Sequence, residues 1–139
     1  MIPIKNETEI ESMRAAGVAA RSVLERLAHM VRPGITTLEL DQAAADFMVE
    51  QRCKSAFLGY RGFPGQVCIS VNEEVVHGIG GPRRLQLGDI VKLDVGVNKA
   101  GWIGDTATTV GVGQTTPTAV RLMEVTKQAL DVALEHAVS

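Results

Sequence analysis

Aromatic residues and cysteines are both scarce in this sequence. Phe, Trp and Tyr make up 4% of the 139 residues, so the core must be built mainly from Val, Leu, Ile and Ala. The two cysteines, Cys53 and Cys68, are too few for a disulfide framework. They also lack the spacing of a zinc-binding motif. A reducing, cytoplasmic setting is the default for such a chain.

Long apolar runs and clusters of basic charge are missing as well. No stretch of about 18 apolar residues occurs, and the charged N-terminus has no apolar centre of the signal-peptide type. Fourteen Lys and Arg against 16 Asp and Glu give a formal net charge of −2, and the basic residues form no long run. We therefore expect a soluble protein that binds neither a membrane nor nucleic acid.

Helical periodicity is found near both ends of the sequence. Apolar residues recur every three or four positions from Glu9 to Met30, and Thr8 with Glu11 has the spacing of a capping box. A second helix is predicted from Thr37 to Cys53, capped by Thr36 or Thr37 itself, and a third from Pro117 to Val138.

The middle of the sequence is rich in Gly and Val and reads as strands separated by turns. The predicted strands are Val67–Val71, Val75–Gly78, Ile90–Val97 and Trp102–Val112. Helices followed by strands and a further helix indicate an α+β fold, an antiparallel sheet with flanking α-helices.

The last helix resembles the first in its apolar pattern. When Val120–Ser139 is laid over Met13–Arg32, most apolar positions coincide. One interpretation is an internal repeat, in which the last helix opens a second half of the fold. The other is chance, because any two amphipathic helices agree at some offset.

A predicted hairpin brings two aspartates together. Asn98–Gly101 is a turn-prone break between two strands, and if Val97 faces Trp102, then Asp94 faces Asp105. Two carboxylates this close either share a proton or hold cations, and carboxylate-bridged pairs of divalent ions recur in hydrolases. The pattern leaves an alternative open, in which a bulge shifts the register and one aspartate is simply exposed.

Five linked motifs occupy the region around this hairpin. They are Leu58–Pro64 (LGYRGFP), Val67–Glu73 (VCISVNE), Val76–Ile79 (VHGI), Gly88–Val95 (GDIVKLDV) and Gly101–Thr106 (GWIGDT). In this order and spacing they closely resemble the type I methionine aminopeptidases, which are pita-bread metallohydrolases. The resemblance covers essentially the whole chain and implies half of a pita-bread (creatinase/aminopeptidase-like) fold.

The resemblance implies a role for each matched residue. Asp94 is similar to the family's bidentate metal ligand, and Asp105 is similar to its bridging ligand. His77 resembles the histidine that contacts the substrate without binding the metals. The residues that resemble the lining of the methionine side-chain pocket are Tyr60, Phe63 and Cys68, with Phe63 in place of a common tyrosine.

The resemblance also implies that part of the site is absent. The family completes its site with one histidine and two glutamates from downstream segments, which this sequence does not contain. We therefore expect residues 1–139 to be the N-terminal half of a catalytic domain. The complete enzyme would use two divalent metal ions (Mn, Fe, Co or Zn) to remove the N-terminal methionine of polypeptides.

Several alternatives remain for the chain alone, which we expect to have little or no activity. It is a fragment of a longer enzyme, a deliberate half-molecule, or one part of a natural split protein with a complementary C-terminal half. A second copy of the chain could also serve as the partner. The competing functional class is a non-enzymatic half-domain or binding module that self-associates or needs a partner chain.

Overall fold

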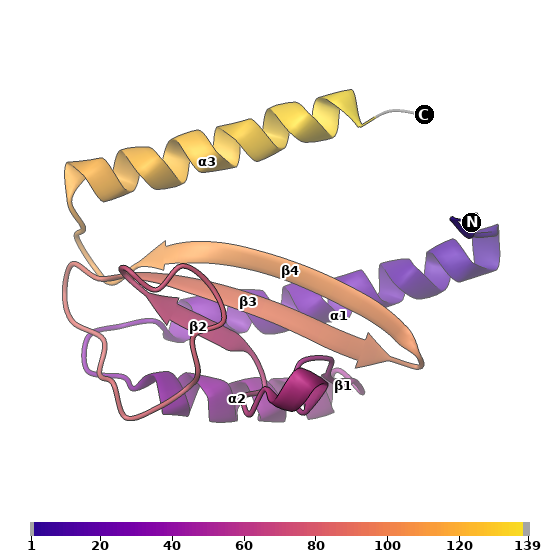
Figure 1. The fold of residues 1–139 in the computed structure, drawn as a ribbon, viewed down its shortest axis with the longest axis horizontal. Coiled ribbons are helices and arrows are strands. Elements are labelled where there is room, and N and C mark those ends of the chain that lie inside the picture. Colours follow the sequence, from indigo (N-terminus) through magenta and orange to yellow (C-terminus); the bar gives the residue numbers. More distant parts are fainter. Residues whose placement is uncertain (1, 138–139) are drawn as a thin grey trace.

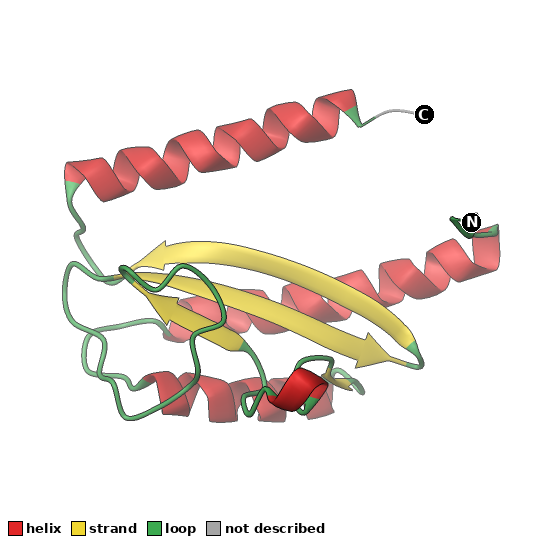
Figure 2. Ribbon diagram, viewed as in Figure 1, coloured by secondary structure: helices red, strands yellow, loops and turns green. Residues whose placement is uncertain are grey.

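The structure, a computed structural model, describes residues 2–137 as one antiparallel sheet with helices around it (Figures 1 and 2). The chain order of its elements is α1 (Glu7–Met30), α2 (Thr37–Glu50), β1 (Lys54–Ser55), the short 3-10 helix η1 (Tyr60–Gly62), β2 (Cys68–Val71), β3 (Ile90–Lys99), β4 (Trp102–Gly111) and α3 (Pro117–His136). The predicted α+β class is confirmed. The last two residues of the sequence, including Val138 of the predicted third helix, lie outside the described range.

The helix boundaries differ from the prediction at two ends. The cap of α1 is Asn6 and not Thr8: the side chain of Asn6 accepts from the Glu9 N–H, and the Glu9 carboxylate accepts from the Asn6 N–H. Asn is the better N-cap residue, so the helix begins earlier than predicted. α2 ends at Glu50, short of Cys53, because Arg52 adopts a left-handed conformation that a helix cannot continue.

The sheet is centred on β3. β4 pairs with one edge of β3, and β1 and β2 both pair with the other, all antiparallel. The predicted strand Val75–Gly78 is wrong, because this segment is a loop that bonds to β2 at Gly78: the Gly78 carbonyl accepts from the Ile69 N–H, and the Gly78 N–H donates to the Ser70 hydroxyl.

The register of the β3–β4 hairpin also differs from the prediction, by two residues. Lys99 pairs with Trp102, and the turn has only two residues, Ala100 and Gly101, both with positive φ. Such a turn matches the natural twist of a hairpin and is tighter than the predicted four-residue break. Asp105 therefore lies opposite Gly96 and not opposite Asp94.

One face of the sheet carries the hydrophobic core. Leu93, Val95 and Val97 of β3 point to this face and are fully buried, and α1 packs against β3 and β4. The approach of α1 to β4 is close at Gly104, where an added Cβ would lie 2.3 Å from the carbonyl oxygen of Ala16. Only glycine fits at this crossing.

The other face of the sheet, called here the open face, carries the polar residues of β3. Lys92, Asp94 and Gly96 point to it, since side chains alternate along a strand. The segment between β1 and β2 covers part of it: the Phe57 ring fills the space above Gly96, where an added Cβ would lie 2.3 Å from the ring.

α3 stands apart from the rest of the molecule (Figure 1). It buries no residue, and its exposed apolar side chains are Val120, Leu122, Val125, Leu130, Val132 and Leu134. No helix among the described residues is long and apolar enough to cross a membrane.

Candidate metal centre and substrate pocket

Asp94 and Asp105 lie on the open face as diagonal neighbours. Asp105 is directly opposite Gly96, two residues along β3 from Asp94, so both carboxylates project from the same side. A register shift of two residues preserves the face, which is why the predicted pairing was wrong while the predicted proximity holds. Gly96 contributes no side chain between the two carboxylates.

The two carboxylates interact electrostatically. Burial, the negative charge of Asp105 and a side-chain hydrogen bond with it raise the pKa of Asp94 from its ordinary value of 3.8 to about 6. The charge of His77 acts in the opposite direction. A pair whose negative charges oppose each other in this way is stabilised by a bound cation.

Cys68 is the neighbour of Asp94 on the other side. The two residues pair directly between β2 and β3, and Cys68 is only 5% exposed. Burial, followed by the charges of Asp94, Asp105 and Asp41, raises the pKa of the Cys68 thiol to about 11. The thiol is therefore neutral near pH 7 and offers an apolar, polarizable surface and not a metal-binding thiolate.

His77 lies in the loop between β2 and β3 in an unusual conformation. Its φ is 60°, a left-handed value that is uncommon for residues other than glycine. The next residue is held against β2: the Gly78 N–H donates to the Ser70 hydroxyl and the Gly78 carbonyl accepts from the Ile69 N–H, both at 2.9 Å. His77 is exposed, and its charge acts on Asp94.

The structure places the two predicted aromatic pocket residues in the segment between β1 and β2. Tyr60 is 62% exposed at the start of η1, and Phe63 is half-buried directly after it. The Ser55 hydroxyl ties this segment together: it accepts from the Phe57 and Leu58 N–H groups and donates to the Gln66 carbonyl.

Sequence reasoning missed two polar side chains of α2. One oxygen of Asp41 accepts from the N–H groups of Gln66 (2.7 Å) and Val67 (3.1 Å), and the Thr37 hydroxyl bonds to the backbone of Gly81. The sequence predicts for Thr37 only a role as a helix cap. Nothing in the sequence distinguishes these side chains from ordinary polar residues on an amphipathic helix.

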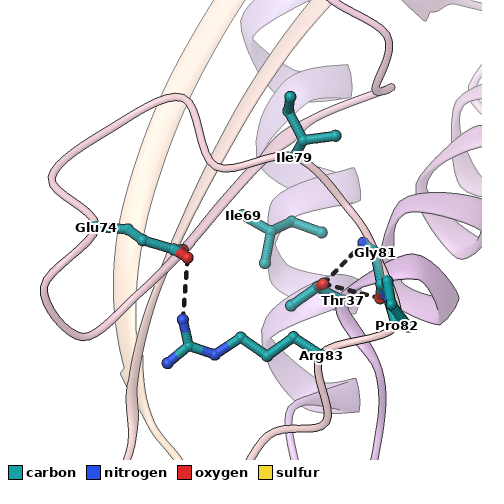
Figure 3. A pocket seen from close by; sticks show the side chains of 7 residues that line it. All are labelled: Thr37, Ile69, Glu74, Ile79, Gly81, Pro82 and Arg83. Carbon is teal, nitrogen blue, oxygen red and sulfur yellow. Dashed lines mark hydrogen bonds and ion pairs between the residues drawn. The ribbon is translucent and has the colours of Figure 1, made fainter.

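A hollow of about 480 Å³ lies behind the His77 loop. Figure 3 shows its lining, with the Thr37–Gly81 bonds at one end and the Glu74–Arg83 ion pair at the other. Ile69 lines the hollow and points to the opposite side of β2 from Cys68. The hollow is therefore separate from the predicted methionine pocket.

Asp94 and Asp105 fit divalent cations in the chemistry of their donor atoms. Carboxylate oxygens are ligands for such ions, and the pKa of Asp94 is raised by burial and then by the negative charge of Asp105, a repulsion that a cation would relieve. Within residues 2–137 no group of three or more His, Cys, Asp or Glu side chains is arranged to hold a metal ion. Among the described residues, the candidate donors for a metal ion at this place are therefore the two carboxylates.

Known proteins resemble this chain along most of its length. A model of metallopeptidase family M24 matches residues 11–139. The methionine aminopeptidase of Clostridium acetobutylicum is 43% identical over 99% of this chain and 56% of its own length. That of Escherichia coli is 47% identical over 96% of this chain and 51% of its own. The chain therefore spans about half the length of the curated relatives it matches.

Solved structures show the same relation. The crystal structure of a methionine aminopeptidase from Thermotoga maritima superimposes with a TM-score of 0.92 at 39% identity, covering 96% of this chain and 54% of that one. A prolidase from Pyrococcus furiosus, 19% identical, shares the fold with a TM-score of 0.78 and 36% of its chain covered. The expectation of a pita-bread fold is confirmed.

Proposed function

The chain belongs to metallopeptidase family M24, and from this membership we propose that residues 1–139 supply the N-terminal half of a methionyl aminopeptidase domain. The complete protein removes the N-terminal methionine from polypeptides. The observation that carries the proposal is the carboxylate pair Asp94 and Asp105 on the open face. The relatives named methionine aminopeptidase support the choice of substrate.

Asp94 and Asp105 are the proposed metal ligands of this half. Two divalent ions of the Mn, Fe, Co or Zn type, when bound, supply an activated water near neutral pH. Asp94 must be ionised to bind a metal ion, and with a pKa of about 6 this is its main form at neutral pH. The exposed imidazole of His77 orients the substrate at the reacting carbonyl through hydrogen bonding.

Tyr60, Phe63 and Cys68 are the proposed wall of the methionine pocket. Cys68 supports this role because its neutral thiol adjoins Asp94, so an apolar surface directly borders the proposed metal ligands. A thioether side chain prefers such a polarizable, apolar wall. Tyr60 is too exposed in the described chain to form a closed pocket by itself, so the complementary half must cover it.

The complementary half is the proposed partner, and two unsatisfied surfaces support it. α3 exposes its apolar side chains, and among the described strands the ten-residue β4 pairs only with β3, which leaves its other edge free. A long unpaired edge and an uncovered apolar helix are both normally covered in a folded protein. A second copy of the chain is the alternative partner.

The free thiols Cys53 and Cys68 are compatible with a cytoplasmic setting.

Metal binding by the chain alone tests the ligand assignment. Calorimetric titration with Mn²⁺ or Co²⁺ should detect binding to the wild type that Asp94→Asn, Asp105→Asn and the double variant weaken. Asp46→Asn, an exposed aspartate of α2, is the matched control for loss of one charge. Equal binding by the wild type and the double variant would rule out these ligands.

Activity tests the division of the site between two halves. The chain should not cleave a Met-Ala-Ser peptide by itself, and activity should appear when a polypeptide covering the C-terminal half of a relative is added with Mn²⁺ or Co²⁺. Robust turnover by the 139 residues alone would contradict the proposed division. Stable complex formation without turnover would favour a non-enzymatic module, and light scattering would reveal a homodimer.

A further inference from the structure

Asp41 connects α2 to the segment that enters β2. Its Oδ1 atom accepts hydrogen bonds from both Gln66 and Val67, the two residues directly before Cys68. An ionised acceptor makes such bonds shorter and stronger than a neutral one. Gly65, just before them, is also in contact, since an added Cβ there would lie 3.2 Å from Asp41 Oδ1 and 3.1 Å from the Phe63 ring. One carboxylate therefore fixes the path of the chain between Phe63 and Cys68.

The same face of α2 also holds the loop that carries His77. Thr37 lies one turn before Asp41, and positions four apart share a helix face. The Thr37 hydroxyl donates to the Gly81 carbonyl (3.1 Å) and accepts from the Gly81 N–H (2.9 Å), as Figure 3 shows. Gly80 packs directly on the helix, because an added Cβ would lie 2.7 Å from the Cβ of Asp41.

The left-handed conformation of His77 depends on the contacts that hold the neighbouring residues of its loop. A left-handed, non-glycine residue persists only where the surrounding structure over-determines it. Gly78 is held by β2 on one side, and Gly80 and Gly81 are held by α2 on the other. The chain directly after His77 is therefore fixed at two successive points, on β2 and on α2, which limits the conformations open to His77.

From these contacts we infer that Asp41 and Thr37 are positioning residues of the proposed active site. They hold the His77 loop and the Phe63–Cys68 segment in fixed relation to each other and to Asp94, without touching the substrate. The inference rests on the proposed function, because it assigns a purpose to the geometry of His77 and of the pocket wall. Neither side chain is among the residues that the sequence motifs single out.

The test uses nuclear magnetic resonance on the chain, with Mn²⁺ alone as a paramagnetic probe. In the wild type, Mn²⁺ at Asp94 and Asp105 should broaden the signals of Ala107, which pairs with Asp94, and of the His77 ring. In Asp41→Ala and in Thr37→Val, broadening at Ala107 should persist and broadening at His77 should be lost. Asp41→Asn should retain the broadening at His77, since its amide oxygen still accepts both N–H groups, although the bonds to a neutral acceptor are weaker. Asp46→Ala, on the same helix, is the control for lost charge.

A second, metal-free measurement separates this inference from the proposed function. Amide exchange at Gln66 and Val67 should become about tenfold faster in Asp41→Ala than in Asp46→Ala, the effect of losing hydrogen bonds to a charged group. If Mn²⁺ fails to broaden the Ala107 signal in the wild type, the proposed metal site is wrong. The amide exchange rates of Gln66 and Val67, together with the His77 chemical shift, then still test whether Asp41 and Thr37 position the loop. If Asp41→Ala does not fold, Thr37→Val decides. Wild-type His77 signals in both variants would overturn the positioning role.

Discussion

α1 and α3 are similar helices in very different surroundings. α1 has 24 residues and α3 has 20, both have an apolar face, and both begin with a side-chain cap, from Asn6 and from Thr116. α1 buries six residues against the rest of the fold, whereas α3 buries none. Amphipathic periodicity therefore identifies the apolar face of a helix. That face contributes to stability only when another element packs against it.

The largest contrast should come from matched leucine truncations. Leu27 of α1 is 0% exposed and Leu130 of α3 is 59% exposed. Leu27→Ala should lower the free energy of unfolding by about 2–5 kcal/mol, and Leu130→Ala should change it by less than about 0.5 kcal/mol. Urea denaturation followed by circular dichroism measures both. A comparable loss in both variants would mean that α3 is packed in solution, as in a dimer.

A smaller contrast concerns the crossing of α1 and β4. Gly104→Ala places a methyl group against the Ala16 carbonyl and should destabilise the chain by about 1–3 kcal/mol. Gly17, in the same helix turn, has no atom within 4 Å of an added Cβ. Gly17→Ala should therefore stabilise the protein by about 0.5–1 kcal/mol, the usual gain in a helix interior. Thermal denaturation of the two variants should show shifts of opposite sign.

The stability of the protein should depend on pH through Asp94 on the open face, and not through the apolar face that carries the hydrophobic core. Because the pKa of Asp94 rises from 3.8 to about 6 on folding, the folded state binds its proton more tightly. The stabilisation from this proton is complete below the ordinary pKa and is lost as the pH rises through 6. Asp94→Asn without metal should thus raise the melting temperature at pH 7.5 but not at pH 4. An equal change at both values would contradict the assigned pKa.

The smallest effects should come from the surface ion pairs of the two helices. On α1, Arg21 Nε lies 2.6 Å from Glu25 Oε1, and on α3, Lys127 Nζ lies 2.7 Å from Asp131 Oδ2. All four side chains are exposed. Glu25→Gln and Asp131→Asn should each cost only about 0.3–0.5 kcal/mol. Hydrogen exchange should nevertheless differ: Asp131→Asn should speed exchange within α3 alone, since α3 depends on local interactions. Faster exchange throughout the chain would refute this independence.

The sequence predicted the fold class, the three helices and three of the strands, because periodicity and turn residues are local signals. It missed the start of α1, where Asn6 competes with Thr8 as a cap, and the two-residue turn at Ala100 and Gly101. The position of Asp105 relative to Asp94 depends on that turn, so the exact pairing was wrong although the shared face was right. The false strand at Val75–Gly78 arose because an apolar run there has no partner strand.

The roles of Asp41 and Thr37 could not be predicted from the sequence. Their partners are backbone groups of Gln66, Val67 and Gly81, at least 25 residues away in the chain. Backbone N–H and carbonyl groups are the same at every residue, so no side-chain pattern records such a contact. Only the three-dimensional arrangement of α2 and the two loops reveals it.

The tight β3–β4 turn also has a consequence for the order of folding. Asp94 and Asp105 belong to one hairpin, and hairpins of this kind close in about 1–10 μs, whereas a ribosome adds only about 5–20 residues per second. When β4 is synthesised, α1 and α2 are already available to cover the apolar side of the hairpin. The hairpin can therefore close as soon as both of its strands are free to pair, and the proximity of the two carboxylates does not depend on α3.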